Sequence, residues 1–128
     1  RSAMLFTALV FDALISRARH LRAPQGAPTL YAFGPDGVLE EAFMRAGLTE
    51  ISAKRLTGTF RFRSPEEYWE TMTAGAGRTG AMLASLEPEV RAKVRGDVLR
   101  RAGRLRVRGF IEIPYEFTLA RGLAPSLR

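Results

Sequence analysis

Residues 105–120, LRVRGFIEIPYEFTLA, carry the most regular pattern in the chain. Strand side chains alternate between two faces, so this pattern predicts one strand with a buried side and a solvent-facing side. Pro114 cannot donate a ladder hydrogen bond, and regular pairing is expected to begin at Tyr115 or to be interrupted at the proline. The apolar members all have odd numbers: Leu105, Val107, Ile111, Ile113, Tyr115, Phe117 and Leu119.

A second strand is predicted over Glu50–Arg63, which is rich in Ile, Thr and Phe. Gly58 suits a β-bulge that turns Phe60 and Phe62 inward. Ser64-Pro65-Glu66-Glu67 is a capping box with proline in the first turn, so a helix is expected from there to Gly75. Apolar spacing predicts further helices over residues 2–22, 39–46, 79–86 and 88–102. The order of elements predicts an α+β fold.

The composition is that of one globular domain, residues 1–128. Hydrophobic residues make up 46% and charged residues 26% of the 128. The chain has no cysteine, which excludes disulfides, thiolate zinc sites and cysteine nucleophiles, and cytoplasm is the expected location. The longest apolar stretch, Ala3–Ile15, is too short to cross a bilayer, so no membrane partner is expected.

The positive charge is concentrated in one segment. The formal net charge is +7, and residues 91–108 hold eight basic side chains against Asp97 alone. Nucleic acid or acidic phospholipid could use such a stripe by phosphate neutralisation. No aromatic residues are interleaved for base stacking, so a solvated helix and strand surface is favoured and nucleic-acid binding is the weaker interpretation.

Three motifs that suggest chemistry have simpler structural interpretations. GAGRTG at residues 75–80 has the spacing of a dinucleotide-binding loop, but a capped helix precedes it instead of a strand, so a link between helices is predicted. His20 is the only histidine and lies among arginines, which makes it a poor general base. The capping box occupies Glu67 in the Glu66, Glu67, Glu70 group. No catalytic constellation and no metal site are therefore expected.

An apolar pocket is the best candidate site. Tyr68, Trp69 and Met72 share one predicted helix, and Phe60 and Phe62 lie just before it. These side chains suit either core packing or a pocket for a flat, apolar ligand, and the indole and phenol groups need polar partners when buried.

Four stretches, in this order and spacing, resemble the C-terminal region of class I S-adenosylmethionine-dependent methyltransferases, in the branch similar to quinone-biosynthesis C-methyltransferases. They are LEEAFMRAGLTEISAKRL (Leu39–Leu56), SPEEYWE (Ser64–Glu70), LEPEVRAKV (Leu86–Val94) and IEIPYEFTLARG (Ile111–Gly122). Leu48 stands where that family usually has phenylalanine. The resemblance implies an antiparallel pair made of the sixth and seventh strands of that fold, with a helical insertion at about residues 64–103.

The resemblance also implies what the chain lacks. The glycine-rich loop and acidic residue that hold S-adenosylmethionine in the family have no counterpart, so no cofactor is expected to bind this chain alone. By position, Phe6, Phe11, Tyr68, Trp69 and Met72 would help to shape the acceptor pocket. The implied function is the substrate side of a methyltransferase that is not catalytic by itself. A stand-alone module for hydrophobic ligands or dimerisation is the alternative.

A homodimer is expected as well. In the family's sheet the seventh strand lies between the fifth and the sixth, so one edge would be open here. An open apolar edge recruits another chain, and pairing of Tyr115–Ala120 across subunits or burial of the first helix would satisfy it.

Overall fold

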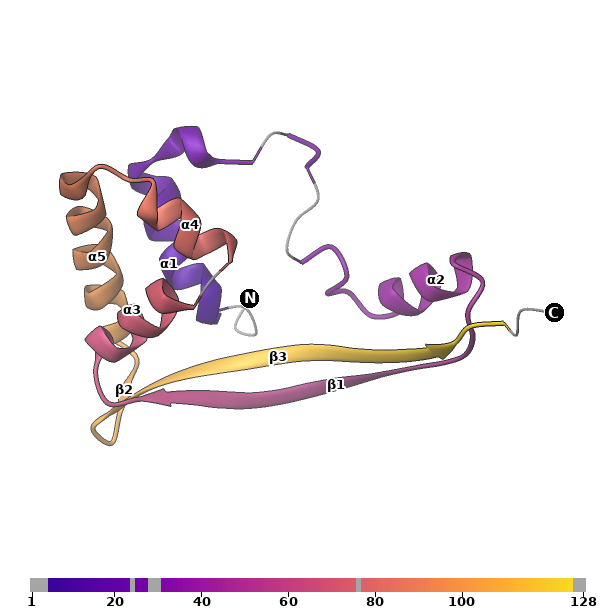
Figure 1. Ribbon diagram of the computed structural model, residues 1–128. Coiled ribbons are helices and arrows are strands. Elements are labelled where there is room, and N and C mark those ends of the chain that lie inside the picture. The colour runs from indigo at the N-terminus through magenta and orange to yellow at the C-terminus, as the bar shows by residue number, and fades with distance from the viewer. Residues whose placement is uncertain (1–4, 24, 28–30, 76, 126–128) are drawn as a thin grey trace. The chain divides into compact units, whose positions relative to one another are not determined.

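The computed structural model describes residues 5–23, 25–27, 31–75 and 77–125, and their fold is α+β, as predicted (Figure 1). Predicted features at residues 2–4, Pro24 and Pro28 lie outside this range. The elements in order are α1 (Leu5–Arg17), the 3-10 helix η2 (Arg19–Leu21), α2 (Val38–Arg45), β1 (Thr49–Phe62), α3 (Pro65–Ala74), α4 (Arg78–Ala84), α5 (Pro88–Gly103), β2 (Arg106–Val107) and β3 (Phe110–Leu123).

The sheet has the strand order β1-β3-β2 and is antiparallel. The two long strands, β1 and β3, lie side by side as neighbours in the sheet (Figure 1). Helices α3, α4 and α5 come between them in sequence. The predicted antiparallel neighbours with a helical insertion between them are therefore present.

The prediction of one strand from Leu105 to Leu119 is wrong at its beginning. Arg106 pairs with Ile111 and Val107 pairs with Phe110, so a two-residue turn folds the segment into a hairpin. The turn residues Arg108 (φ 50°) and Gly109 (φ 88°) both have positive φ, the geometry that matches the twist of tight hairpins. Strand β3 runs from Phe110 to Leu123 and includes Pro114.

Residue contacts divide the chain into two compact units, and each unit takes part of both long strands. Unit 1 comprises Arg1–Ala23 and Gly58–Tyr115, and unit 2 comprises Pro24–Thr57 and Glu116–Arg128. The main hydrophobic core lies in unit 1, where α1, α3, α4 and α5 pack together (Figure 1). Its fully buried large side chains are Val10, Leu14, Tyr68, Leu83, Val94, Val98, Ile111 and Ile113.

Helix α1 packs mainly on α5, and a buried carboxylate joins the two helices. Asp97 on α5 is only 5% exposed. It accepts a hydrogen bond from Arg17 Nε at 2.8 Å and a second one from Arg100. The Arg17 bond holds the pKa of the Asp97 carboxyl below its usual value; burial opposes this, and Arg100 adds to the lowering. Asp97 is therefore charged at neutral pH and anchors α1 to α5.

Helix α3 begins as the sequence predicts, with one difference. Ser64 Oγ accepts a hydrogen bond from the Glu67 amide at 3.1 Å, and Pro65 stands in the first turn. The Glu67 carboxylate accepts from the amide of Arg63, one residue earlier than the reciprocal bond of a capping box. The Glu67 carboxylate thus also holds Arg63, the residue before the N-cap.

In unit 2, α2 covers the strands on the side that carries the even residues of β3. A Cβ at Gly122 would lie 3.1 Å from Leu48 Cβ and 3.3 Å from Phe43 Cδ2, so the glycine permits this close approach. The odd residues Phe117 and Leu119, predicted to be buried, are 54% and 62% exposed. That prediction is wrong because the position of α2 decides which side is covered here.

Replacing Asp97 with Asn should lower the free energy of unfolding by about 1–3 kcal/mol at pH 7, because charge-assisted hydrogen bonds to two arginines are lost. The folded-state pKa of Asp97 lies below its unfolded value near 3.8. The stabilisation is therefore complete above that value and is lost as pH falls through the lower, folded pKa. Urea unfolding of both proteins from pH 7 to pH 2.5 measures this. A difference that stays constant over the whole range would contradict the assignment.

Candidate functional site

Five aromatic residues of unit 1 form one connected group, called here the aromatic cluster. The rings of Phe6 and Phe60 lie 4.6 Å apart between centroids, and those of Phe60 and Tyr115 lie 4.5 Å apart. Tyr68 meets Phe6 and Phe62 edge to face, at 5.9 and 5.4 Å. Its five members are Phe6, Phe60, Phe62, Tyr68 and Tyr115. The cluster therefore joins side chains of α1, β1, α3 and β3 in one apolar surface.

Tyr68 is the structural anchor of the cluster. Its side chain is fully buried, and its hydroxyl donates a hydrogen bond to the backbone carbonyl of Phe6. Burial raises the pKa of the phenol well above its ordinary value of 10, so it stays protonated at physiological pH. Tyr68 thus ties α1 to α3 and is no candidate for a general base.

Tyr115 lies flat over the backbone of β1 at Gly58. A Cβ at position 58 would stand 2.9 Å from Tyr115 Cε1 and closer still to Cζ and Oη. Gly58 keeps a negative φ, so the glycine is required here for space and not for backbone conformation. The ring is consequently held between Gly58 and Phe60, and it remains half-buried.

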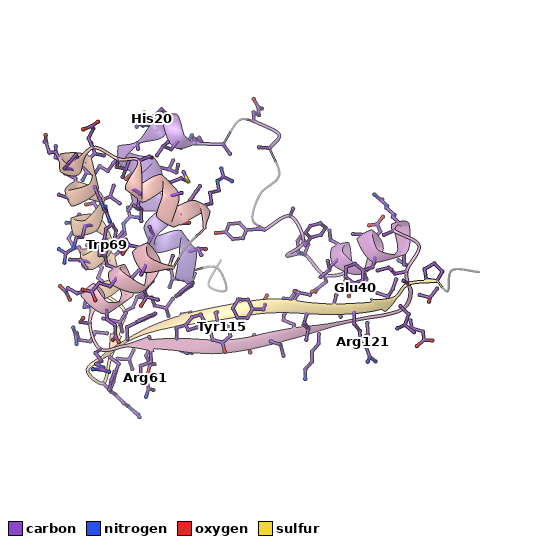
Figure 2. The ribbon with its side chains drawn as sticks, viewed as in Figure 1. His20, Glu40, Arg61, Trp69, Tyr115 and Arg121 are labelled. Atoms are coloured by element: carbon purple, nitrogen blue, oxygen red, sulfur yellow. The ribbon has the colours of Figure 1, made fainter. Side chains whose placement is uncertain are left out.

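The structure separates the predicted pocket residues into two groups. Phe6 and Phe60 are half-buried members of the aromatic cluster, and fully buried Tyr68 supports them. Trp69 and Met72 are buried in the core of unit 1, and Phe11 packs against that core (Figure 2).

Sequence reasoning missed Tyr115 as a member of this surface. Its odd position predicts that it points inward, but that pattern alone does not distinguish a core ring from one at a surface. The spatial signal is Gly58, which the sequence suggested as a bulge. Only the pairing of β1 with β3 brings the glycine under the tyrosine ring.

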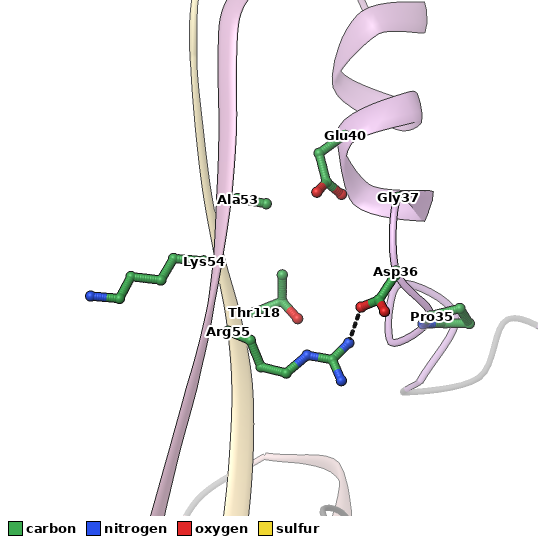
Figure 3. A pocket seen from close by; sticks show the side chains of 8 residues that line it. All are labelled: Pro35, Asp36, Gly37, Glu40, Ala53, Lys54, Arg55 and Thr118. Atoms are coloured by element: carbon green, nitrogen blue, oxygen red, sulfur yellow. Dashed lines mark hydrogen bonds and ion pairs between the residues drawn. The ribbon is translucent and has the colours of Figure 1, made fainter.

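Unit 2 contains a small polar hollow between α2 and the strands (Figure 3). Arg55 lies between two carboxylates, donating to Asp36 and lying 3.1 Å from Glu116. The Lys54 side chain extends away from the hollow, whereas the Glu40 carboxylate faces it (Figure 3). Since its arginine is already neutralised, the hollow offers no spare cation for a phosphate or carboxylate ligand.

The glycine-rich stretch at residues 75–80 and His20 lie where the sequence predicts simple structural roles. In the GAGRTG stretch, Gly75 is the C-cap of α3, Gly77 (φ 104°) is the N-cap of α4, and Arg78 begins α4, so the described residues lie between two helices as predicted; Ala76 lies outside the described residues. His20 is exposed on η2 (Figure 2).

Across residues 5–23, 25–27, 31–75 and 77–125, no three carboxylate or imidazole groups gather in a way that could hold a metal ion. Within the same ranges, every helix is too short or too polar to span a bilayer.

No family model, curated protein or solved structure matches the chain.

The contact between Gly58 and Tyr115 can be tested by a double-mutant cycle. Gly58→Ala should lower the free energy of unfolding by about 1–3 kcal/mol, because the new methyl group displaces the Tyr115 ring. In a Tyr115→Ala background the same change should be neutral or stabilising by about 0.5–1 kcal/mol, since alanine restricts the unfolded chain.

Gly96→Ala is the matched control. Gly96 lies on α5, and a Cβ added to it would have no neighbouring atom within 4 Å. The substitution should therefore stabilise the helix by roughly 0.5–1 kcal/mol. Equal effects of Gly58→Ala in both backgrounds would show that the two residues are not coupled.

Proposed function

We propose that this chain forms the acceptor-binding part of an S-adenosylmethionine-dependent methyltransferase and is not catalytic alone. The observation that carries the proposal is the pairing of β1 with β3 around the insertion α3–α5, the arrangement implied by the family resemblance. All four resembling stretches span or begin regular elements. Leu39–Leu56 runs from α2 into β1, Ser64–Glu70 starts α3, Leu86–Val94 starts α5, and Ile111–Gly122 lies in β3.

The aromatic cluster is the surface proposed to receive the acceptor. Phe6, Phe60 and Tyr115 are half-buried, so parts of their rings stay accessible while their positions are fixed by packing. Aromatic rings held in this way favour stacking with a flat, apolar molecule. An aromatic or quinone-like acceptor is therefore the proposed substrate class.

The cluster supplies orientation and not reaction chemistry. Its buried phenol, Tyr68, is protonated and already donates to Phe6. The methyl donor, S-adenosylmethionine, would be held by segments other than this chain. The chain's own contribution is then to place the acceptor and to exclude water from one side of it.

The test joins this chain to the sequence encoded upstream of it and measures transfer of a labelled methyl group from S-adenosylmethionine to a hydroquinone acceptor. Transfer is expected from the joined protein, and calorimetry should show no cofactor binding to this chain alone. Tyr115→Leu should raise the KM for the acceptor by roughly tenfold, the size expected for loss of one aromatic contact. Phe33→Leu, at an exposed ring outside the cluster, is the control.

A stand-alone binding module is the second candidate, favoured by the same preformed cluster. In that case 1,4-naphthoquinone would quench the fluorescence of Trp69 in this chain, Tyr115→Leu would weaken the quenching, and the joined protein would transfer no methyl group. Methyl transfer by the joined protein would favour the methyltransferase proposal over the stand-alone binding module.

We also propose that the chain forms a homodimer through β3. Strand β2 accompanies β3 only at Phe110 and Ile111, so within the described residues no strand lies along that side of β3 further on. Helix α1 already packs against α5 and α4 in unit 1, which leaves the strand edge as the proposed contact. Such an edge favours antiparallel pairing with a second copy.

Size-exclusion chromatography with light scattering should give a mass twice that of the 14.2 kDa chain at micromolar concentration. A monomer at all concentrations would contradict the proposal.

A further inference from the structure

The turn between β2 and β3 presents two apolar side chains to solvent. Val107 is 46% exposed and Phe110 is 39% exposed. The two residues are direct partners in the hairpin register, so both side chains project on the same face of it. The buried neighbour Ile111 instead pairs with Arg106 on the other face. The tip therefore carries a small apolar surface that contributes nothing to the core.

Four arginines lie in the hairpin or next to it. Arg106 donates to the carbonyl of Gly109 at 2.8 Å and so lies along the turn, and Arg108 occupies the turn itself. The Arg61 guanidinium lies over the ring of Phe110, 5.2 Å from its centroid, and the Glu112 carboxylate pairs with it at 2.7 Å. Arg104 ends α5 just before the hairpin. Among the described residues, Arg104, Arg106 and Arg108 have no acidic partner.

Apolar side chains beside arginines that have no acidic partner suit the surface of an anionic bilayer. The apolar groups enter the boundary between headgroups and acyl chains, and the guanidinium groups of Arg104, Arg106 and Arg108 bind lipid phosphates. Nucleic acid fits less well, because Phe110 is the single ring that the tip offers for base stacking. We propose that the β2–β3 tip docks on membranes that contain acidic phospholipids.

Such docking needs no membrane-spanning segment. The expectation of no membrane partner rests on the lack of a stretch long enough to cross a bilayer, whereas a peripheral contact depends only on the tip. It is also independent of the methyltransferase proposal, since none of its residues belongs to the aromatic cluster.

Flotation with phosphatidylcholine vesicles containing 30% phosphatidylglycerol tests the docking. The chain should float with these vesicles in 50 mM salt, should float less in 300 mM salt, and should not float with pure phosphatidylcholine. Arg106→Gln with Arg108→Gln should weaken binding roughly fivefold for each arginine. Arg91→Gln with Arg95→Gln removes two exposed arginines of α5 away from the tip and is the matched control.

Insertion of the apolar pair is measured separately. The chain has no cysteine, so Val107→Cys accepts a single environment-sensitive fluorophore. Its emission should shift to the blue on addition of the phosphatidylglycerol vesicles, whereas the same label at Met44→Cys, another exposed site, should not shift. Fluorescence of the buried Trp69 reports that each variant is folded.

Three results would overturn the proposal. They are equal flotation with neutral and anionic vesicles, equal loss of binding in the tip and α5 arginine variants, and retention on a DNA duplex without flotation. The last result would assign the basic segment to nucleic acid.

Discussion

The pairing of β1 with β3 is the constraint on which the rest of the chain depends. Each of the two compact units is built on a part of this strand pair. In unit 1 the pairing brings Phe60 and Phe62 next to Tyr115 and the buried Ile111 and Ile113. In unit 2 it supplies the surface on which α2 packs through Phe43 and Leu48. Without the pairing, Phe60 would lose its contact with Tyr115, and Phe43 and Leu48 would lose theirs with Gly122.

The aromatic cluster shows how that pairing gives a candidate site. Its members come from α1, the end of β1, the start of α3 and the middle of β3. Contacts so far apart in sequence form only when the whole of unit 1 has folded, which makes their geometry well fixed. Rigid rings that remain partly accessible are suited to positioning a flat ligand, because little side-chain entropy is lost on binding.

Local signals in the sequence predicted the regular elements well. Ser64 as N-cap, Pro65 in the first turn and the apolar period of α5 each act within a few residues, so they can be recognised without a structure. The hairpin was missed because Arg108-Gly109 lacks the asparagine or aspartate that usually marks its turn. The odd-numbered pattern also continues on both sides of it.

Features set by packing between distant segments could not be predicted in this way. The exposure of Phe117 and Leu119 depends on where α2 lies, and the role of Gly58 depends on the ring of Tyr115. Phe60, Tyr68, Trp69 and Met72 were recognised as candidates, but only the structure shows that Phe60 is half-buried among other rings whereas the other three lie in the core.

The exposed side of the unit 2 strands has a consequence for the colloidal behaviour of the chain. Leu56, Phe117, Leu119 and Leu123 are all solvent-accessible there, which favours self-association of the dissolved protein. The net charge of +7 opposes it by mutual repulsion between molecules. Salt screens that repulsion and leaves the attraction between apolar surfaces in place. Concentrated solutions of this chain are therefore more stable against precipitation at low ionic strength than at high ionic strength.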